Sequence, residues 1–132
     1  MVKKVLFIDD DKGLVRMMRI LFKRRNFDFY TAGIGQQGIE MADEVNPDVI
    51  ILDIGLPDMK GFEVCKEIKE RKKGKQIPII FVTGQYFGEQ DREKGFKMGA
   101  DDFLIKPFDQ EELLTRISII MEKYTSSKDK SE

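Results

Sequence analysis

The sequence predicts an α/β fold, a doubly wound parallel sheet of five strands with helices on both faces. Short apolar runs alternate with longer amphipathic segments along the 132 residues. Two of the runs, residues 49–52 and 77–82, are almost wholly apolar, which is typical of strands buried on both faces. Parallel strands need long crossover connections, usually helices, so the alternation itself favours a parallel sheet.

The first half of the chain gives two strands and two helices. Residues 5–8 are rich in β-forming residues and stop at a run of aspartates, the last of which, Asp11, can cap the helix that follows. Apolar residues recur in that helix at helical spacing up to about residue 25. Residues 27–31 form the next expected strand and residues 36–45 the next helix, which ends before a proline.

The middle of the chain continues the alternation. The strand at residues 49–52 leads through a loop at residues 56–61 to a helix expected over residues 62–72. The strand at residues 77–82 is followed by a helix over residues 89–98, which a glycine closes.

The C-terminal part supplies the last strand and helix. The strand over residues 102–105 ends before a Lys-Pro pair, and the final helix is expected over residues 110–124. Residues 125–132 are rich in Ser, Lys, Asp and Glu and lack apolar anchors, so we expect a disordered tail or the start of a linker. The sequence thus predicts one domain, residues 1–124.

The composition argues against several kinds of partner and chemistry. The 23 basic and 24 acidic residues give a formal charge of −1, so the net charge gives no reason to expect nucleic acid or a membrane surface as a partner. No apolar run approaches the roughly 18 residues of a membrane-spanning helix, no signal peptide is evident, and the single Cys65 fits the reducing cytoplasm. The absence of histidine excludes Ser-His-Asp triads and Cys-His pairs within the chain, and zinc sites are not expected.

Polar side chains stand at the carboxyl ends of four expected strands. They are Asp9 and Asp10 after the first strand, Asp53 after the third, Thr83 after the fourth and Lys106 after the fifth. Ligands of an open parallel sheet bind at this edge, so we expect these side chains to meet there. Clustered carboxylates without His or Cys favour Mg²⁺, for which Mn²⁺ can substitute.

Asp53 is the expected reactive group. An ionised carboxylate needs no general base to attack phosphorus, provided that the protein orients the donor and neutralises the transferring oxygens. Lys106 can pair with the phosphoryl group or, before transfer, with Asp53, and Thr83 can donate a hydrogen bond to the added oxygens. Alone, Asp53 could be a turn or helix cap, Thr83 an ordinary strand residue and Lys106 a surface lysine; the prediction depends on their combination.

These residues closely resemble the receiver domain of two-component response regulators, over roughly residues 3–124. Four segments carry the resemblance: Ile8-Asp9-Asp10-Asp11, residues 52–61 (LDIGLPDMKG), Val82-Thr83-Gly84, and residues 99–108 (GADDFLIKPF). The resemblance implies the flavodoxin-like (βα)5 receiver fold with strand order 2-1-3-4-5. It also implies signalling through an aspartyl phosphate.

The resemblance assigns metal ligands and the phosphorylated residue. Asp9 and Asp10 would be the acid pair that serves Mg²⁺, and Asp53 would be both a ligand and the phosphoacceptor. The backbone carbonyl of Gly55 would be a further ligand. Many relatives have a polar side chain at this last position, so its absence here bears on the lifetime of the phosphoryl group.

The resemblance also names the residues that report phosphorylation. Thr83 would be the switch hydroxyl, Lys106 the lysine that pairs with the phosphate, and Phe103 the aromatic residue whose rotamer follows the switch. Simple core packing is the alternative for Phe103. The family usually has a cis peptide bond before the proline that follows the lysine, here Pro107.

Five charged residues match positions through which winged-helix response regulators form active dimers: Lys94, Asp101, Asp102, Glu112 and Arg116. They lie in or next to the fourth helix, the fifth strand and the fifth helix, within residues 88–122, so a homodimer through this face is expected as one outcome. The alternative is that Glu112 and Arg116 only form an i,i+4 pair worth about 0.3 kcal/mol.

The sequence therefore predicts a phosphorylation-activated switch of a two-component phosphorelay. A sensor histidine kinase or phosphotransfer protein would donate the phosphoryl group to Asp53, since this chain has no histidine of its own. The domain would catalyse only its own phosphorylation and dephosphorylation, and control an output partner. Two alternatives stay open: a metal-dependent phosphatase that uses the Asp9-x-Asp11 segment, and an interaction module that is never phosphorylated.

Overall fold

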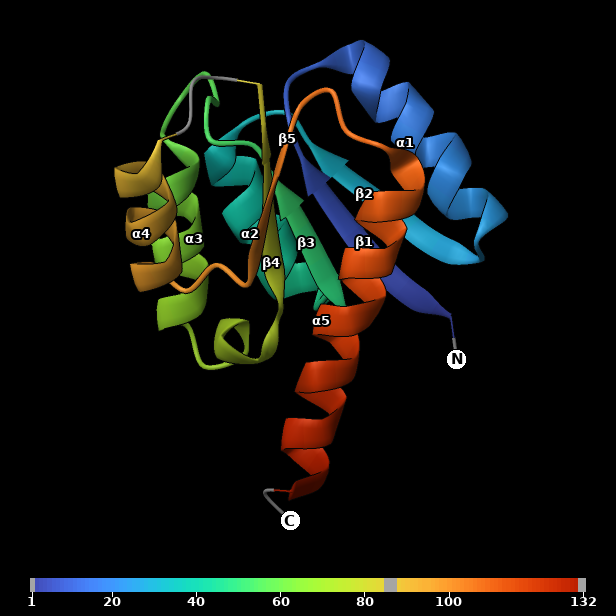
Figure 1. Cartoon of the computed structure of the whole chain (residues 1–132), viewed down its shortest axis with the longest axis vertical. Coiled ribbons are helices and arrows are strands. Elements are labelled where there is room, and N and C mark those ends of the chain that lie inside the picture. The colour runs from blue at the N-terminus through green and yellow to red at the C-terminus, as the bar shows by residue number, and fades with distance from the viewer. Residues whose placement is uncertain (1, 85–87, 131–132) are drawn as a thin grey trace.

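The computed structural model describes residues 2–84 and 88–130. In this part of the chain, five parallel strands form one sheet in the order β2-β1-β3-β4-β5 (Figure 1). The strands are β1 (Lys3–Ile8), β2 (Phe27–Ala32), β3 (Val49–Leu52), β4 (Ile79–Thr83) and β5 (Asp102–Ile105). The helices are α1 (Lys12–Arg24), α2 (Gly35–Val45), α3 (Gly61–Glu70), α4 (Glu89–Lys97) and α5 (Gln110–Lys130), with a 3-10 turn, η1, at Gly74–Gln76.

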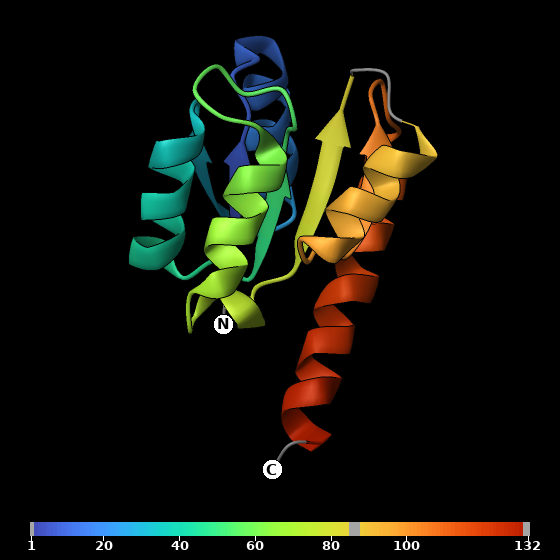
Figure 2. The same cartoon turned by 90° about the vertical axis from the view of Figure 1, so that its left-hand side faces the viewer.

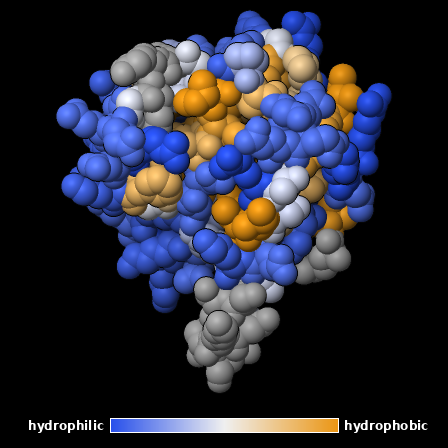
Figure 3. Space-filling view, in the orientation of Figure 1, coloured by the Kyte–Doolittle hydropathy of each residue, from blue (hydrophilic) through white to orange (hydrophobic). Residues whose placement is uncertain are grey.

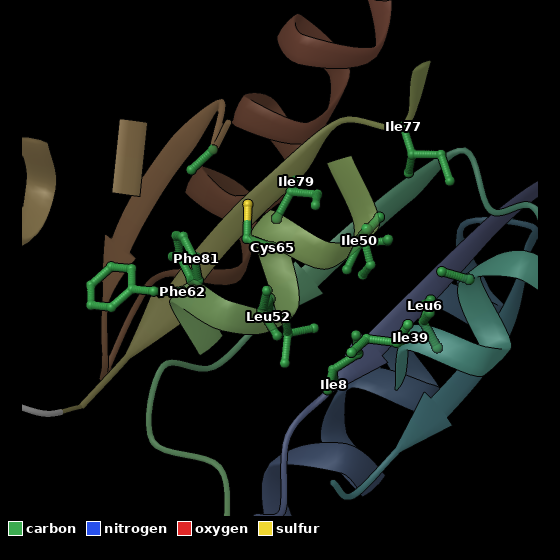
Figure 4. Packing of buried hydrophobic residues seen from close by; sticks show 14 of the residues in the cluster. Leu6, Ile8, Ile39, Ile50, Leu52, Phe62, Cys65, Ile77, Ile79 and Phe81 are labelled. Atoms are coloured by element: carbon green, nitrogen blue, oxygen red, sulfur yellow. The ribbon is translucent and has the colours of Figure 1, made fainter. Parts of the chain in front are cut away.

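Helices cover both faces of the sheet, as the sequence predicts. Figure 2 shows α2, α3 and α4 in front of the strands, on the opposite face from α1. Alternate residues of the strands point to the two faces: Leu6 and Ile8 of β1 join the core under α2 and α3, whereas Val5 and Phe7 join the core under α1 and α5. Figure 4 shows the first of these cores, with side chains of β1, β3 and β4 meeting those of α2 and α3.

The central strands are buried throughout. Every residue of β3 and every residue of β4 is buried. This explains their continuous apolar sequences, since both faces of a central parallel strand lie under helices. The carboxyl ends of these strands therefore sit on a rigid, densely packed layer.

Apart from the end of the final helix, the element boundaries match the expectation to within two residues, and two of the larger differences lie between α3 and β4. The helix α3 ends at Glu70 instead of residue 72, and β4 begins at Ile79 instead of residue 77. Within the segment between them, Gly74–Gln76 form η1, and the backbone N–H of Ile77, directly after it, donates to the carbonyl of Gly74 at 3.1 Å. Pro78, which has no backbone N–H, then delays the start of β4.

The final helix is longer than expected. It continues to Lys130, whereas the sequence suggested an end at residue 124 and a disordered tail or linker beyond it. Residues 125–130 contain no glycine or proline that would stop a helix, and the hydroxyl of Thr125 donates to the carbonyl of Met121 at 3.1 Å. Residues 131–132 lie outside the described part, and the division into a domain at residues 1–124 and a tail stays a prediction.

No helix among the described residues is both long enough and apolar enough to cross a membrane.

Candidate functional site

The candidate site lies at the carboxyl ends of the strands, where the sequence predicts it. The backbone N–H of Asp53 donates to the carbonyl of Ile8 at 3.0 Å, and that of Lys106 donates to Thr83 at 2.8 Å. Asp53 and Lys106 are therefore held by the sheet itself, directly after β3 and β5, and Asp9 has the corresponding place after β1. Thr83 is the last residue of β4, so the four residues share one edge.

Three of these residues form an acidic cluster. One carboxylate oxygen each from Asp9, Asp10 and Asp53 lies within 4.8 Å of the others. Asp9 and Asp53 are 1% and 8% exposed, whereas Asp10 faces solvent. Burial raises the pKa of Asp9, although hydrogen bonds from Lys106 and from the Asp11 backbone oppose the rise. A small set of carboxylates with one side open to water suits Mg²⁺, which keeps several waters, so the residues present fit this cation.

Lys106 is the counter-charge of the cluster. Its Nζ lies 2.7 Å from Asp9 Oδ2 and 3.4 Å from Asp53 Oδ2. Burial alone would lower the pKa of Lys106, but the hydrogen bonds and charges of the two carboxylates outweigh it and raise the pKa above its usual value. One ammonium group therefore bridges two aspartates and stays charged at neutral pH. The peptide bond between Lys106 and Pro107 is cis, as the resemblance implies.

Asp11 is a helix cap, as expected. Its carboxylate accepts the backbone N–H of Leu14 at 3.1 Å, and its own N–H donates to Asp9 Oδ1 at 2.9 Å. Its side chain is therefore engaged at the start of α1. A phosphatase that used the Asp9-x-Asp11 segment would need this second aspartate for its chemistry, so the structure gives that alternative no support.

Known proteins resemble this chain over most of its length. The family model of the response regulator receiver domain matches residues 5–118. The chain belongs to the response regulator receiver family. The cell cycle response regulator CtrA of Brucella ovis is 35% identical over 120 residues, which are 91% of this chain and 50% of that protein. The chain spans about half the length of the curated relatives it matches.

Solved structures agree with this receiver assignment. The chemotaxis protein CheY4 of Vibrio cholerae is 30% identical, with a TM-score of 0.84 over 89% of this chain and 98% of that one. A CheY-like receiver domain protein of Methanospirillum hungatei has a TM-score of 0.90 over 96% of this chain and 99% of that one, and its 22% identity supports the fold alone. The expected strand order of the receiver fold, 2-1-3-4-5, is confirmed.

The expected switch residues of this receiver domain are both buried. Thr83 is 1% exposed and Phe103 is 6% exposed. The Phe103 ring stacks on Phe81, with centroids 5.4 Å apart, and makes a T-shaped contact with Phe96, with centroids 4.7 Å apart. A Cβ atom on Gly95 would lie 2.3 Å from the Phe103 ring, so α4 reaches the ring because this residue has no side chain. Phe103 thus packs in the core, and its role as a rotamer switch stays a prediction.

The charged residues of the expected dimer face make different kinds of contact in the structure. Arg116 binds Asp102 Oδ1 at 2.7 Å and Glu112 Oε1 at 3.1 Å, so the expected i,i+4 pair exists and extends to β5. Lys94 lies on α4 with its Nζ 5.0 Å from the centroid of the Phe62 ring. Dimerisation of the receiver domain through these residues stays a prediction.

Asp101 takes part in a partly buried network that the sequence did not reveal. Its carboxylate accepts the Tyr124 hydroxyl at 2.9 Å and the backbone N–H of Ile79 at 2.8 Å. Lys69 Nζ donates to the same hydroxyl at 2.8 Å. Burial lowers the pKa of Lys69 and raises the pKa of Tyr124. The only signal in the sequence is that Lys69 lies one helical turn after Cys65, on the buried side of α3.

Proposed function

We propose that the protein is a phosphorylation-activated switch of a two-component phosphorelay, in which Asp53 accepts a phosphoryl group from a phosphohistidine. The supporting observation is the ammonium of Lys106, at 2.7 Å from Asp9 and 3.4 Å from Asp53, beside carboxylates that fit Mg²⁺. A carboxylate that only capped a turn would need neither the counter-charge nor the cluster. The proposed location is the cytoplasm, where a free cysteine such as Cys65 stays reduced.

The proposed transfer uses groups that the site already holds. A carboxylate oxygen of Asp53 attacks phosphorus and forms a P–O bond. The P–N bond to the donor imidazole breaks, and its electron pair stays on the ring nitrogen, which takes up a proton. Lys106 and the Thr83 hydroxyl bind the transferred oxygens. When bound by the three carboxylates and the Gly55 carbonyl, Mg²⁺ or Mn²⁺ supplies further positive charge at these oxygens.

The donor is a sensor histidine kinase or a phosphotransfer protein, which the receiver family implies as the partner. The domain would supply its own catalytic groups for phosphorylation and, with water as the attacking molecule, for dephosphorylation. It would turn over no metabolite.

Labelling with a small phosphodonor tests the proposal. With phosphoramidate and Mg²⁺, intact-mass spectrometry of the wild type is expected to show one added phosphoryl group. Asp53→Asn is expected to take no label, and chelation of the metal with EDTA should prevent labelling of the wild type. Asp28→Asn changes an exposed aspartate of β2 and is expected to label normally. Labelling that survives in Asp53→Asn would refute the assignment.

The output surface of the proposed switch is the face formed by α4, β5 and α5. Phe96, Ile105 and Ile119, one on each element, are 46%, 50% and 53% exposed. Figure 3 shows hydrophobic residues interrupting the hydrophilic surface on this side of the molecule. Exposed apolar groups beside the Arg116 ion pairs favour a protein partner, either an output protein or a second copy of the chain.

Sedimentation velocity with and without beryllofluoride, a phosphoryl mimic, tests whether the partner is a second copy. A dimer is expected only with the mimic and Mg²⁺, and Ile119→Asp should prevent it. Ile20→Asp changes a residue on α1 that is 55% exposed and should leave the dimer intact. A monomer at high concentration under both conditions would contradict dimerisation and leave an output protein as the occupant of this face.

A further inference from the structure

Asp58, in the loop between β3 and α3, caps a helix to which it does not belong. Its Oδ1 accepts the backbone N–H of Gly35 at 2.7 Å, and its Oδ2 accepts that of Gln36 at 2.9 Å. Gly35 and Gln36 are the first two residues of α2, and the helix's own N-cap residue, Ile34, makes no side-chain capping bond. The backbone N–H groups, that of Gln36 foremost, hold the pKa of Asp58 below its usual range, so it caps α2 as a charged acceptor.

The two ends of the same loop are joined to each other beside Asp53, the proposed phosphoacceptor. The backbone N–H of Gly61 donates to the carbonyl of Ile54 at 2.7 Å, and Gly55 forms a short antiparallel bridge with Lys60. A Cβ atom on Gly61 would lie 2.3 Å from the backbone oxygen of Asp53, so only glycine lets the chain return this closely. The position of the loop and the position of Asp53 are therefore linked.

The tip of the loop rests on α2. A Cβ atom on Gly35 would lie 2.4 Å from Met59 Cγ, which shows how tightly the helix and the loop meet. The strand before α2 also reaches the acidic site, because the last residue of β2 accepts the backbone N–H of Asp9 at 3.0 Å. Contacts thus run in a closed ring from Asp9 through β2 and α2 to Asp58, and along the loop to Asp53.

We propose that Asp58 is a positioning residue for the metal-binding and phosphorylation site. This inference rests on the proposed function, since the loop it holds carries Asp53 and the Gly55 carbonyl. Among the described residues, the two bonds of Asp58 are the hydrogen bonds that tie the loop tip, residues 56–59, to another element. Without them the loop would have to be ordered when the cation binds, and that ordering would weaken binding.

Substitutions at Asp58 separate this role from general stability. Binding of Mn²⁺ would be measured by electron paramagnetic resonance, with competition by Mg²⁺, and phosphoramidate labelling would be followed at low and saturating metal. Asp58→Ala is expected to weaken Mn²⁺ binding about 10-fold, the low end for outer-shell changes at metal sites. Asp58→Asn keeps one carbonyl acceptor and is expected to lose less Mn²⁺ affinity than Asp58→Ala. Saturating metal should restore most of the labelling rate.

Asp48 provides the matched control. Its carboxylate accepts the backbone N–H of Lys4 at 2.7 Å, at the opposite end of the sheet from Asp53. Asp48→Ala should lower the urea midpoint and leave Mn²⁺ affinity unchanged. Wild-type affinity in Asp58→Ala would overturn the positioning role. Equal losses in Asp58→Ala and Asp58→Asn would also overturn it, because they would assign the effect to the lost charge.

The proposed function can fail separately from this inference. If the wild type neither binds Mn²⁺ nor takes up a phosphoryl group, the proposed function is wrong and the role of Asp58 falls with it. If the wild type does both and the Asp58 variants match it, only the positioning role is wrong.

Discussion

Replacing Lys106 by methionine tests the electrostatic design of the site without any phosphodonor. The change removes an ammonium that lies 2.7 Å from Asp9 and 3.4 Å from Asp53 and keeps a side chain of similar length. In metal-free buffer with EDTA, the carboxylates of Asp9, Asp10 and Asp53 would then lie close together with no positive charge between them. We expect the free energy of unfolding to fall, and to fall by an amount that depends on pH.

The size of the loss follows from the burial of each partner. Removing one member of a fully buried ion pair costs about 3–5 kcal/mol. Here the Lys106 side chain is 19% exposed, and Asp9 keeps its bond from the backbone N–H of Asp11 at 2.9 Å. We therefore expect a loss of about 2 kcal/mol at pH 8, below the range for a fully buried pair.

The sign of the pH dependence follows from Asp9. Its pKa in the folded protein is already raised by burial above 3.8, and loss of Lys106 raises it further. At a pH between the unfolded and the folded pKa of Asp9, this carboxyl group is protonated in the folded variant and ionised in the unfolded chain. Lowering the pH therefore stabilises the folded variant. The raised pKa of Lys106 lies above 10.5, so the wild type keeps the full contribution of that group below this pH and loses it only at higher pH. The difference between the two proteins should therefore shrink to about 1 kcal/mol or less at pH 5.

Urea unfolding at pH 8 and pH 5 measures this difference. Lys66→Met, at an exposed position of α3, is the control and should change stability by no more than about 0.5 kcal/mol. Added Mg²⁺ should narrow the gap for Lys106→Met, because the cation would compensate the same carboxylates. A loss in Lys106→Met that is equal at the two pH values would refute the reasoning about Asp9.

Two further predictions concern the far end of the sheet. Tyr124→Phe removes a hydroxyl that binds Lys69 at 2.8 Å and Asp101 at 2.9 Å. Urea unfolding should show a loss of about 2 kcal/mol, against about 0.5 kcal/mol or less for Tyr30→Phe, and equal losses would contradict the network. Burial raises the pKa of Cys65 to about 12, so at pH 8 iodoacetamide should alkylate the folded protein far more slowly than the protein in urea. Equal rates by mass spectrometry would show that this thiol is accessible.

The place of the site could be predicted from one property of parallel sheets. Residues at the carboxyl ends of successive strands meet at one edge, and Asp9, Asp53, Thr83 and Lys106 do so. The identity of the side chains then indicated the chemistry, because clustered carboxylates need a cation. The fold could be predicted for a similar reason, since continuous apolar strands such as β3 are typical of a sheet covered on both faces.

Contacts between distant elements could not be predicted in this way. Asp58 caps α2 across 23 and 22 residues of sequence, and Lys69 meets Tyr124 across 55. Neither pairing leaves a periodic pattern, because each depends on how loops and helix ends pack after the sheet has formed. Asp101 shows the consequence: no pattern in the sequence indicated that its carboxylate binds Tyr124 and Ile79, and its place in the dimer face stays a prediction.

Strand β5 is where the site and the output face meet. Asp101, just before this strand, binds Tyr124 of α5. Along the strand, Asp102 binds Arg116 of α5 and Phe103 packs under α4, while Lys106 follows directly and binds the acidic cluster. Among the described strands β5 pairs with β4 alone, so it can shift at lower cost than a central strand. Under the proposed function, a phosphoryl group on Asp53 gives Lys106 a new partner at one end of this edge strand. The displacement then acts on α4 and α5 together, because both are held by residues of the same four-residue strand.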